Sequence, residues 1–359
     1  MYKREHGGNV DEIARERGIE KGTIIDFSAN INPLGYPEGV RRKVMDAFEC
    51  ILNYPDPDSH DLTRALAQYH GIASEHILVG NGATEFIYWL PLLFRPKRAL
   101  IVTPAFSEYE KGLRMAGADI SFFHTRMEEG FRVDTGMLAT HITEGIDMVC
   151  LGNPASPSGI LTEKEHLYAL IDVAEKAGRI VVIDEAFMDF VEEGSVKKRA
   201  IDSKGVVILR SMTKFFGIPG LRVGYCIAGA GIIARIRSGM PPWTVNVPAQ
   251  QAAAAALEDL SYIRRSQSYI QTEREYLESQ LSDIEGLSVM SGAANYLLVH
   301  MDDAFPLDAP GLRERMLASG IVIRDCSNYR GLDACFFRVA VKKREENMIL
   351  VNELRRIRA

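Results

Sequence analysis

Four short apolar runs in the first two thirds of the chain constrain its fold more than any other feature. They are residues 99–103, 147–151, 179–183 and 205–209. Strands that are apolar at nearly every position, rather than at alternate ones, suit a parallel sheet covered by helices on both faces. Helix-like stretches separate the runs, such as 163–177, for which we expect Thr162 as the N-cap and Gly178 as the stop. The pattern predicts an α/β fold with a mostly parallel sheet.

The last third of the chain has a different pattern. A long helical stretch at about 249–282 precedes strand-like runs at 287–290, 294–300 and 336–341, with helices expected at 310–319 and 344–357. This mixture predicts a smaller α+β domain. We therefore expect an N-terminal arm and part of the small domain in residues 1–45, a large cofactor-binding domain in 46–240, and a small C-terminal domain after an interdomain helix in 241–359.

Composition excludes several classes of protein. The formal net charge of −6 argues against a nucleic-acid partner. The five cysteines are scattered without a C-x-x-C pair, so we expect neither a metal site nor disulfides, and a reducing cytoplasm is the expected location. The N-terminus lacks the apolar core of a signal peptide, and no apolar run is long enough to span a bilayer. We expect a soluble enzyme without membrane contact.

The segment after the 205–209 run carries the strongest chemical signal. Lys214 lies at this strand end among hydroxyls and glycines, and an arginine, Arg222, follows eight residues later. The lysine amine can condense with an aldehyde. Ser211, Thr213 and Arg222 can converge on a phosphate. This spacing predicts a lysine that carries an aldehyde cofactor with a phosphate group.

Three further strand-end segments extend this hypothesis. Asp184 follows the 179–183 run and could keep a pyridine nitrogen protonated, although a lone aspartate there is more often a helix cap. The backbone amides of Gly82, Ala83 and Thr84 open a helix and could bind a phosphate, although many helices begin this way for capping alone. Phe106 could stack on a cofactor ring or simply fill the core.

Taken together, these segments resemble the fold-type-I pyridoxal-phosphate enzymes, in the branch that contains histidinol-phosphate aminotransferases and L-threonine-O-3-phosphate decarboxylases. The resemblance covers essentially the whole chain. It implies pyridoxal 5′-phosphate bound to Lys214 as a Schiff base, a seven-stranded large domain, and a homodimer. It also implies that Tyr54, in the segment Asn53-Tyr54-Pro55-Asp56, reaches the cofactor phosphate of the neighbouring subunit.

Segments near both ends of the chain resemble the decarboxylases of that branch. They are residues 6–9, 26–35, 323–332 and 337–341. The resemblance implies a carboxy-lyase that converts L-threonine O-3-phosphate to (R)-1-aminopropan-2-yl phosphate for cobalamin biosynthesis. The residues implied to bind this substrate are His6, Gly7, Asn30, Ser156, Arg324 and Arg338. We hypothesise that phosphate binding by the arginines and His6 turns the substrate carboxylate out of the cofactor plane, which selects decarboxylation.

Two positions depart from the aminotransferase pattern. Ser156 stands where this branch usually has an asparagine that binds the cofactor O3′, and Phe187 stands where aminotransferases usually have a tyrosine. Phenylalanine cannot donate a hydrogen bond, and it fits the decarboxylase pattern. With fewer donors to O3′, we expect the Schiff base to hold its proton to higher pH than in typical aminotransferases.

Two other functions stay open on the sequence alone. One is a histidinol-phosphate aminotransferase of histidine biosynthesis. The other is a non-catalytic pyridoxal-phosphate-binding protein whose site has decayed at Ser156. Decay would not be expected to spare one particular set of residues, yet the chain keeps Lys214, Asp184, Arg222 and Arg338.

Overall fold

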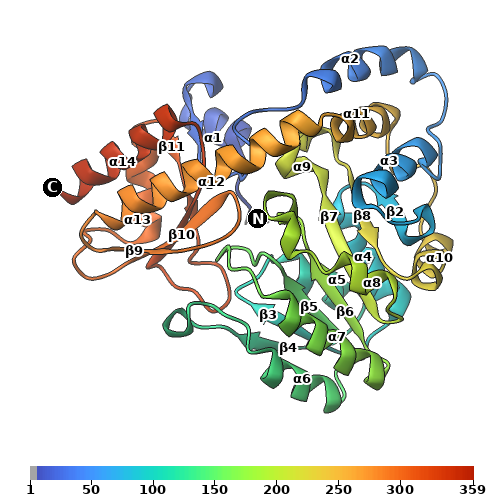
Figure 1. Ribbon diagram of the computed structural model, residues 1–359. Helices are drawn as coiled ribbons and strands as arrows, with labels where there is room; N and C mark the ends of the chain where they lie inside the picture. The colour runs from blue at the N-terminus through green and yellow to red at the C-terminus, as the bar shows by residue number, and fades with distance from the viewer. Residues whose placement is uncertain (1–5) are drawn as a thin grey trace.

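A seven-stranded sheet forms the centre of the larger part of the molecule. The computed structural model describes residues 6–359 (Figure 1). The strands lie in the order β2-β8-β7-β6-β5-β3-β4. Their bounds are β2 Ile77–Gly80, β3 Arg98–Thr103, β4 Asp119–His124, β5 Met148–Gly152, β6 Ile180–Asp184, β7 Val206–Ser211 and β8 Gly224–Ile227. Only β8 runs antiparallel to its neighbours, so the predicted, mostly parallel α/β sheet is confirmed.

The four apolar runs are β3, β5, β6 and β7, and burial on both faces explains why they are unbroken. In β6, Val181 and Ile183 pack into the core on one face of the sheet, together with Leu167 of the helix α7, Lys164–Ala177. Val182 packs into the core on the other face, with Phe86. Because side chains alternate between the faces of a strand, a sheet covered twice needs apolar residues at every position.

Helices cover this sheet and connect its strands. Their bounds are α3 His60–His70, α4 Ala83–Phe94, α5 Glu108–Met115, α6 Thr135–Thr143, α7 Lys164–Ala177, α8 Lys197–Ile201, α9 Met212–Phe215 and α10 Ala230–Gly239. Gly178 ends α7 in the left-handed conformation, as expected. The expected N-cap was wrong, because Glu163 takes that position. Thr162 instead donates its backbone N–H to the Asn153 side chain at 2.8 Å.

The smaller part combines two sheets with helices from both ends of the chain. A four-stranded antiparallel sheet has the order β12-β13-β10-β9, and a parallel pair joins β1 to β11. The strands are β1 Ile25–Asp26, β9 Leu287–Met290, β10 Tyr296–Met301, β11 Ile321–Val322, β12 Arg324–Asp325 and β13 Phe336–Ala340. Its helices are α1 Val10–Arg17, α12 Leu260–Ser282, α13 Ala309–Ala318 and α14 Arg344–Arg358. Two further helices, α2 Glu38–Asp46 and α11 Val247–Glu258, pack together beside α3 of the larger part (Figure 1). Short 3₁₀ turns lie at Lys21–Thr23, Ala47–Cys50, Ser74–His76, Met127–Glu129, Met188–Phe190, Glu192–Gly194 and Pro219–Leu221.

The single helix expected at 249–282 is two helices. Asp259 leaves the helical conformation (φ −86°, ψ 77°), and its side chain caps α12 by accepting from the Tyr262 N–H at 2.9 Å. Beyond this break, α12 runs from the larger to the smaller part of the molecule (Figure 1). Strand β1, from the N-terminal segment, pairs in parallel with β11. The exact domain limits of 45 and 240 stay a prediction.

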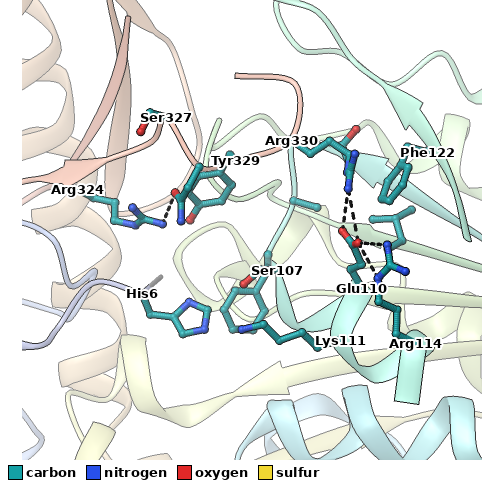
Figure 2. Close-up of a pocket in the computed structure, with 15 residues that line it drawn as sticks. His6, Ser107, Glu110, Lys111, Arg114, Phe122, Arg324, Ser327, Tyr329 and Arg330 are labelled. Carbon is teal, nitrogen blue, oxygen red and sulfur yellow. Dashed lines mark hydrogen bonds and ion pairs between the residues drawn. The ribbon is translucent and has the colours of Figure 1, made fainter. Parts of the chain in front are cut away.

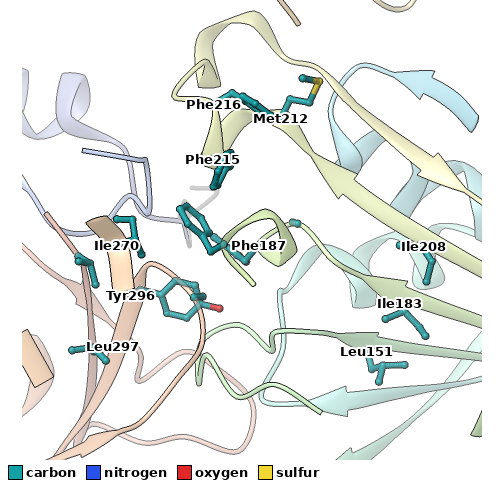
Figure 3. Close-up of a cluster of buried hydrophobic side chains, with 14 of the residues drawn as sticks. Leu151, Ile183, Phe187, Ile208, Met212, Phe215, Phe216, Ile270, Tyr296 and Leu297 are labelled. Carbon is teal, nitrogen blue, oxygen red and sulfur yellow. The ribbon is translucent and has the colours of Figure 1, made fainter. Parts of the chain in front are cut away.

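One hydrophobic core continues from the large sheet into the smaller part (Figure 3). It includes Leu151 and Ile183 of the sheet, and Tyr296 of β10. Phe187 lies between them, with its ring edge-on to Tyr296 at a centroid distance of 4.9 Å. This continuity fixes the smaller part beside the carboxyl ends of the strands, where ligands of α/β sheets bind. In the described residues, no helix has both the length and the apolar character needed to cross a bilayer.

Candidate active site

Lys214 lies in the single turn of α9, directly after β7. The Ser211 hydroxyl caps this turn and lies 2.7 Å from the Thr213 hydroxyl, and the Lys214 Nζ donates to Thr213 Oγ1 at 3.1 Å. Burial lowers the pKa of Lys214 to about 8; the charge of Asp184 opposes this shift, and the charge of Arg222 adds to it. A neutral amine is therefore accessible near physiological pH, as a nucleophilic lysine requires.

Asp184 ends β6 and is buried. The Tyr109 hydroxyl donates to its Oδ2 at 2.6 Å, and the Ala186 N–H donates to Oδ1 at 3.0 Å. Burial raises the pKa of Asp184, and the two hydrogen bonds and the charge of Lys214 offset this only partly. A cation against this carboxylate would stabilise its charged form. Tyr109 escaped the sequence reasoning, although its position three residues after Phe106 places it one helical turn onward.

Gly82 and Arg222 approach each other closely at the N-terminus of α4. Gly82 has φ +78°, a conformation that other residues rarely adopt, and a Cβ there would lie 2.7 Å from Arg222 Nη2 and displace this guanidinium group. Arg222 itself has φ +57°, a left-handed conformation that non-glycine residues rarely adopt outside functional sites. The amides of Ala83 and Thr84 lie in the first turn of α4, where N–H groups lack helical acceptors. The structure thus brings Gly82, Arg222 and the first turn of α4 together, and their binding of a phosphate stays a prediction.

Arg324 and Arg338 are directly opposite each other on the paired strands β12 and β13. Arg338 Nη1 donates to Ser156 Oγ at 3.2 Å, and Nη2 donates to the Ser28 carbonyl at 3.2 Å. Arg324 Nη2 donates to Asn328 Oδ1 at 2.8 Å. Like charges opposite each other destabilise a strand pair, so this arrangement suits an anion that lies between or beside the two guanidinium groups.

Some buried polar atoms on this side lack a hydrogen-bond partner within residues 6–359, and two of them matter for ligand binding. They are Arg338 Nε and Asn30 Oδ1. Both side chains are almost fully buried, with 6% and 5% of their surface exposed. Leaving a buried donor or acceptor unpaired costs about 1–3 kcal/mol, so these atoms indicate a bound polar ligand.

The N-terminal segment reaches this side of the site across Ser28. The Gly8 N–H donates to Ser28 Oγ at 2.9 Å, and a Cβ on Gly7 would lie 2.2 Å from the Ser28 carbonyl oxygen. Position 7 therefore accepts only glycine. The His6 ring lies 5.2 Å from the Phe106 ring, and both residues line a cavity of about 520 Å³ together with Arg324 (Figure 2).

Asn32, which sequence reasoning did not select, links the N-terminal segment to the lysine. Its backbone N–H donates to the Lys214 carbonyl at 3.0 Å, and its side-chain Nδ2 donates to the Phe215 carbonyl at 2.9 Å. The Tyr262 hydroxyl of α12 also donates to the Phe215 carbonyl, at 2.8 Å. Asn32 lies in the segment 26–35 that resembles the decarboxylases, but the sequence does not show that this asparagine binds the main chain beside Lys214.

Ser156 lies beside Arg338 and so belongs to the substrate side of the site. Asn153, the nearest asparagine, is fully buried, and its side-chain oxygen accepts from Thr162. The Tyr296 hydroxyl donates to the Ala155 carbonyl at 2.8 Å. Phe187 lies against the lysine, with Lys214 Nζ 5.8 Å from its ring centroid.

Tyr54 is the one cofactor candidate that the described chain does not bring to this site. Tyr54 is 82% exposed, and its ring packs on Trp243 at a centroid distance of 5.0 Å. Among the described residues, the cavity beside Tyr54 is lined chiefly by α3 and α11, and none of the other cofactor candidates contributes to it. A role for Tyr54 at the cofactor therefore requires a second subunit.

Comparison with known proteins agrees with this geometry. The model of the family described as aminotransferase class I and II matches residues 22–354. The chain belongs to this family. Its cofactor is pyridoxal 5′-phosphate. The buried Lys214 amine, the buried Asp184 carboxylate and the cradle of Gly82 and Arg222 fit the aldehyde, ring nitrogen and phosphate of that cofactor.

Individual members of the aminotransferase family resemble the chain over nearly its full length. Threonine-phosphate decarboxylase from Salmonella typhimurium is 36% identical, over 99% of this chain and 97% of that protein. Histidinol-phosphate aminotransferase 2 from Archaeoglobus fulgidus is 34% identical, over 93% of each chain. The crystal structure of L-threonine-O-3-phosphate decarboxylase from Porphyromonas gingivalis superposes with a TM-score of 0.81 at 27% identity, over 91% of this chain and 97% of that one.

Proposed function

We propose that the protein decarboxylates L-threonine O-3-phosphate, releasing carbon dioxide and (R)-1-aminopropan-2-yl phosphate for cobalamin synthesis. The observation that carries this proposal is the pair of guanidinium groups of Arg324 and Arg338, with a buried Arg338 Nε that has no partner within residues 6–359. A substrate with both a carboxylate and a phosphate supplies two anions to these groups. The full-length similarity to the Salmonella decarboxylase supports the same substrate.

Each residue has a definite task in this reaction. Bound pyridoxal phosphate supplies an electron sink for the electron pair that carbon dioxide leaves behind. Asp184, held by Tyr109, keeps a positive charge on the ring nitrogen favourable. The arginines and His6 would hold the substrate's anionic groups and so orient the carboxylate, rather than the Cα hydrogen, for cleavage. The Lys214 amine then returns a proton to Cα.

The proposal includes a homodimer in which Tyr54 serves the neighbouring subunit's site. Exposed large apolar side chains gather in one stretch of the chain and comprise Tyr36, Met45, Phe48, Ile51, Leu52 and Tyr54. Such a concentration of exposed apolar surface is typical of a protein–protein interface. All five cysteines carry free thiols, which supports the predicted cytoplasmic location.

Product analysis tests the proposed reaction. Purified holoenzyme is incubated with L-threonine O-3-phosphate, and separately with histidinol phosphate plus 2-oxoglutarate. We expect carbon dioxide and aminopropanol phosphate from the first mixture, with Lys214→Ala as the inactive control. Glutamate formation in the second mixture without carbon dioxide in the first would overturn the proposal in favour of the aminotransferase. A yellow protein that is inert in both would show a decayed site.

A further inference from the structure

Glu108 is a buried carboxylate that the reaction described above does not use. It lies behind the cavity of about 520 Å³, here called the substrate cavity because His6 and Arg324 line it, and contacts two of its lining residues. It is the first residue of α5, two residues after Phe106. Its side chain is 11% exposed. A buried carboxylate is costly unless charged or polar donors surround it, so its partners show what it does.

Three donors converge on Glu108, one from its own helix α5 and two from distant parts of the chain. His6 Nε2 lies 2.7 Å from Oε1, and Lys111 Nζ donates to the same oxygen at 2.8 Å. The Tyr88 hydroxyl of α4 donates to Oε2. Burial raises the pKa of Glu108, but the hydrogen bonds from Lys111, Tyr88 and His6 outweigh it, so the pKa falls below its usual value. Glu108 is therefore ionised at neutral pH.

Both nitrogen-bearing partners of Glu108 line the substrate cavity. His6 and Lys111 are cavity residues, and Figure 2 shows them along the side that faces Arg324 and Tyr329. Long side chains such as lysine lose considerable rotamer freedom when a ligand orders them. A carboxylate that already holds the two groups lowers this entropic cost when an anion binds.

We propose that Glu108 is a positioning residue for substrate recognition, holding His6 and Lys111 at the cavity wall to bind the substrate's phosphate. Lys111 thereby becomes a phosphate-binding residue in addition to those predicted from the sequence. The inference rests on the proposed function, because it takes threonine phosphate as the substrate. It concerns substrate binding and gives Glu108 no part in breaking the bond to carbon dioxide.

Glu273 is a matched control for the loss of a buried carboxylate. It is 4% exposed in α12 and accepts from Arg344 at 2.9 Å and from Asn347 at 3.2 Å. None of these residues lines the substrate cavity. The variants Glu108→Gln and Glu273→Gln both keep the side-chain volume and remove one buried charge. They differ in whether that charge lies beside the substrate cavity or away from it.

Steady-state kinetics of the two holoenzyme variants test the proposal. We expect Glu108→Gln to raise KM for threonine phosphate about tenfold while kcat changes less than about twofold, because charge-assisted hydrogen bonds orient the binding groups. We expect Glu273→Gln to lower the melting temperature and leave KM unchanged. The cofactor absorbance should be the same in both variants and in the parent protein. An unchanged KM in a folded Glu108→Gln would overturn the proposal.

A double-mutant cycle separates positioning from general stabilisation. If Glu108 acts through His6, Glu108→Gln should raise KM much less in a His6→Gln background than in the parent protein. Fully additive effects on KM would contradict the proposal. Lys111→Met should raise KM as Glu108→Gln does. Failure of the proposed function gives a different result, namely a parent enzyme without carbon dioxide release.

Discussion

The cofactor side and the substrate side of the site differ in how completely the protein supplies hydrogen-bond partners and opposite charges for their polar residues. The cofactor side is built at the strand ends of one sheet and the helices that follow them. Hydroxyl groups contact Asp184 and Lys214, and a left-handed backbone conformation positions Arg222. On the substrate side, Arg324 opposes Arg338 with like charge, and buried polar atoms lack partners within the described residues.

This difference indicates that one side determines which cofactor binds and the other determines which substrate binds. The cofactor side belongs to the segment that matches the aminotransferase class I and II family, residues 22–354, so it identifies the cofactor. The substrate side is assembled from the smaller part and the N-terminal segment and is strained until an anion binds. We therefore expect that damage to the cofactor side stops all chemistry, whereas damage to the substrate side alters affinity and reaction type. The following predictions test this contrast.

The largest effect is expected from Lys214→Ala. The variant should lose turnover by at least about a thousandfold and lose the yellow colour of covalently bound cofactor, because no other amine replaces it. It should fold normally, as measured by circular dichroism. Retention of the colour would show that the cofactor side is not organised around this lysine.

Arg338→Ala should come next. The variant should lose about a hundredfold in kcat/KM for threonine phosphate, since it removes a buried charge that binds an anion. Covalent cofactor binding, measured by absorbance, should persist. Arg338→Lys keeps the charge but not the forked donor, and should recover only part of the activity. Loss of cofactor binding in these variants would mean that the two sides are not separable.

Tyr109→Phe should have a smaller effect on the cofactor side. It removes the hydroxyl that opposes the burial-driven rise in the pKa of Asp184, so that pKa should rise further. We expect cofactor affinity and kcat to fall about tenfold, the usual cost of one charge-assisted hydrogen bond. The loss should be greatest at low pH, where protonation of Asp184 removes its charge. A kcat loss that is independent of pH would contradict this explanation.

The rate at which the apoprotein captures pyridoxal phosphate should depend on pH through Lys214. Burial holds the pKa of that amine at about 8, so the rate should rise with pH and level off just above 8. An unperturbed lysine would give a rate that climbs to about pH 10.4. Stopped-flow absorbance distinguishes the two profiles, and continued increase beyond pH 9 would show that the amine is not buried as described.

The smallest effect is expected from Arg324→Gln on stability. Removing one of two opposed like charges should stabilise the substrate-free protein by about 0.2–1 kcal/mol in thermal unfolding. Added inorganic phosphate should raise the melting temperature of the parent more than that of the variant. A variant less stable than the parent without phosphate would show that the arginine pair is not strained.

Sequence reasoning succeeded where a periodic pattern or a chain-local motif carried the signal. The apolar runs predicted β3, β5, β6 and β7, because a strand that is buried on both faces needs apolar residues at nearly every position. Lys214, Asp184 and Gly82 were found because strand ends and helix starts are local features. Asp259 was missed as a helix break, since a single aspartate inside an alanine-rich stretch does not differ visibly from a solvated one.

The partners of site residues could not be found in this way. Tyr109, Asn32 and Glu108 act through contacts with residues that lie 75, 182 and 102 positions away, namely Asp184, Lys214 and His6. Only the folded chain creates these pairs. The interpretation of Ser156 also needed the structure, because its neighbour is Arg338, which comes from a different sheet.

The position of Asn32 has a consequence for protein engineering. The residues from Ser28 to Asn32 touch Arg338 at one end and the carbonyl of Lys214 at the other. The residues that contact the substrate therefore cannot be exchanged independently of those that position Lys214. A substrate side grafted from another family member would carry its own version of this stretch and could shift the main chain that presents the lysine. Successful grafts should be those that leave the contacts of Asn32 intact.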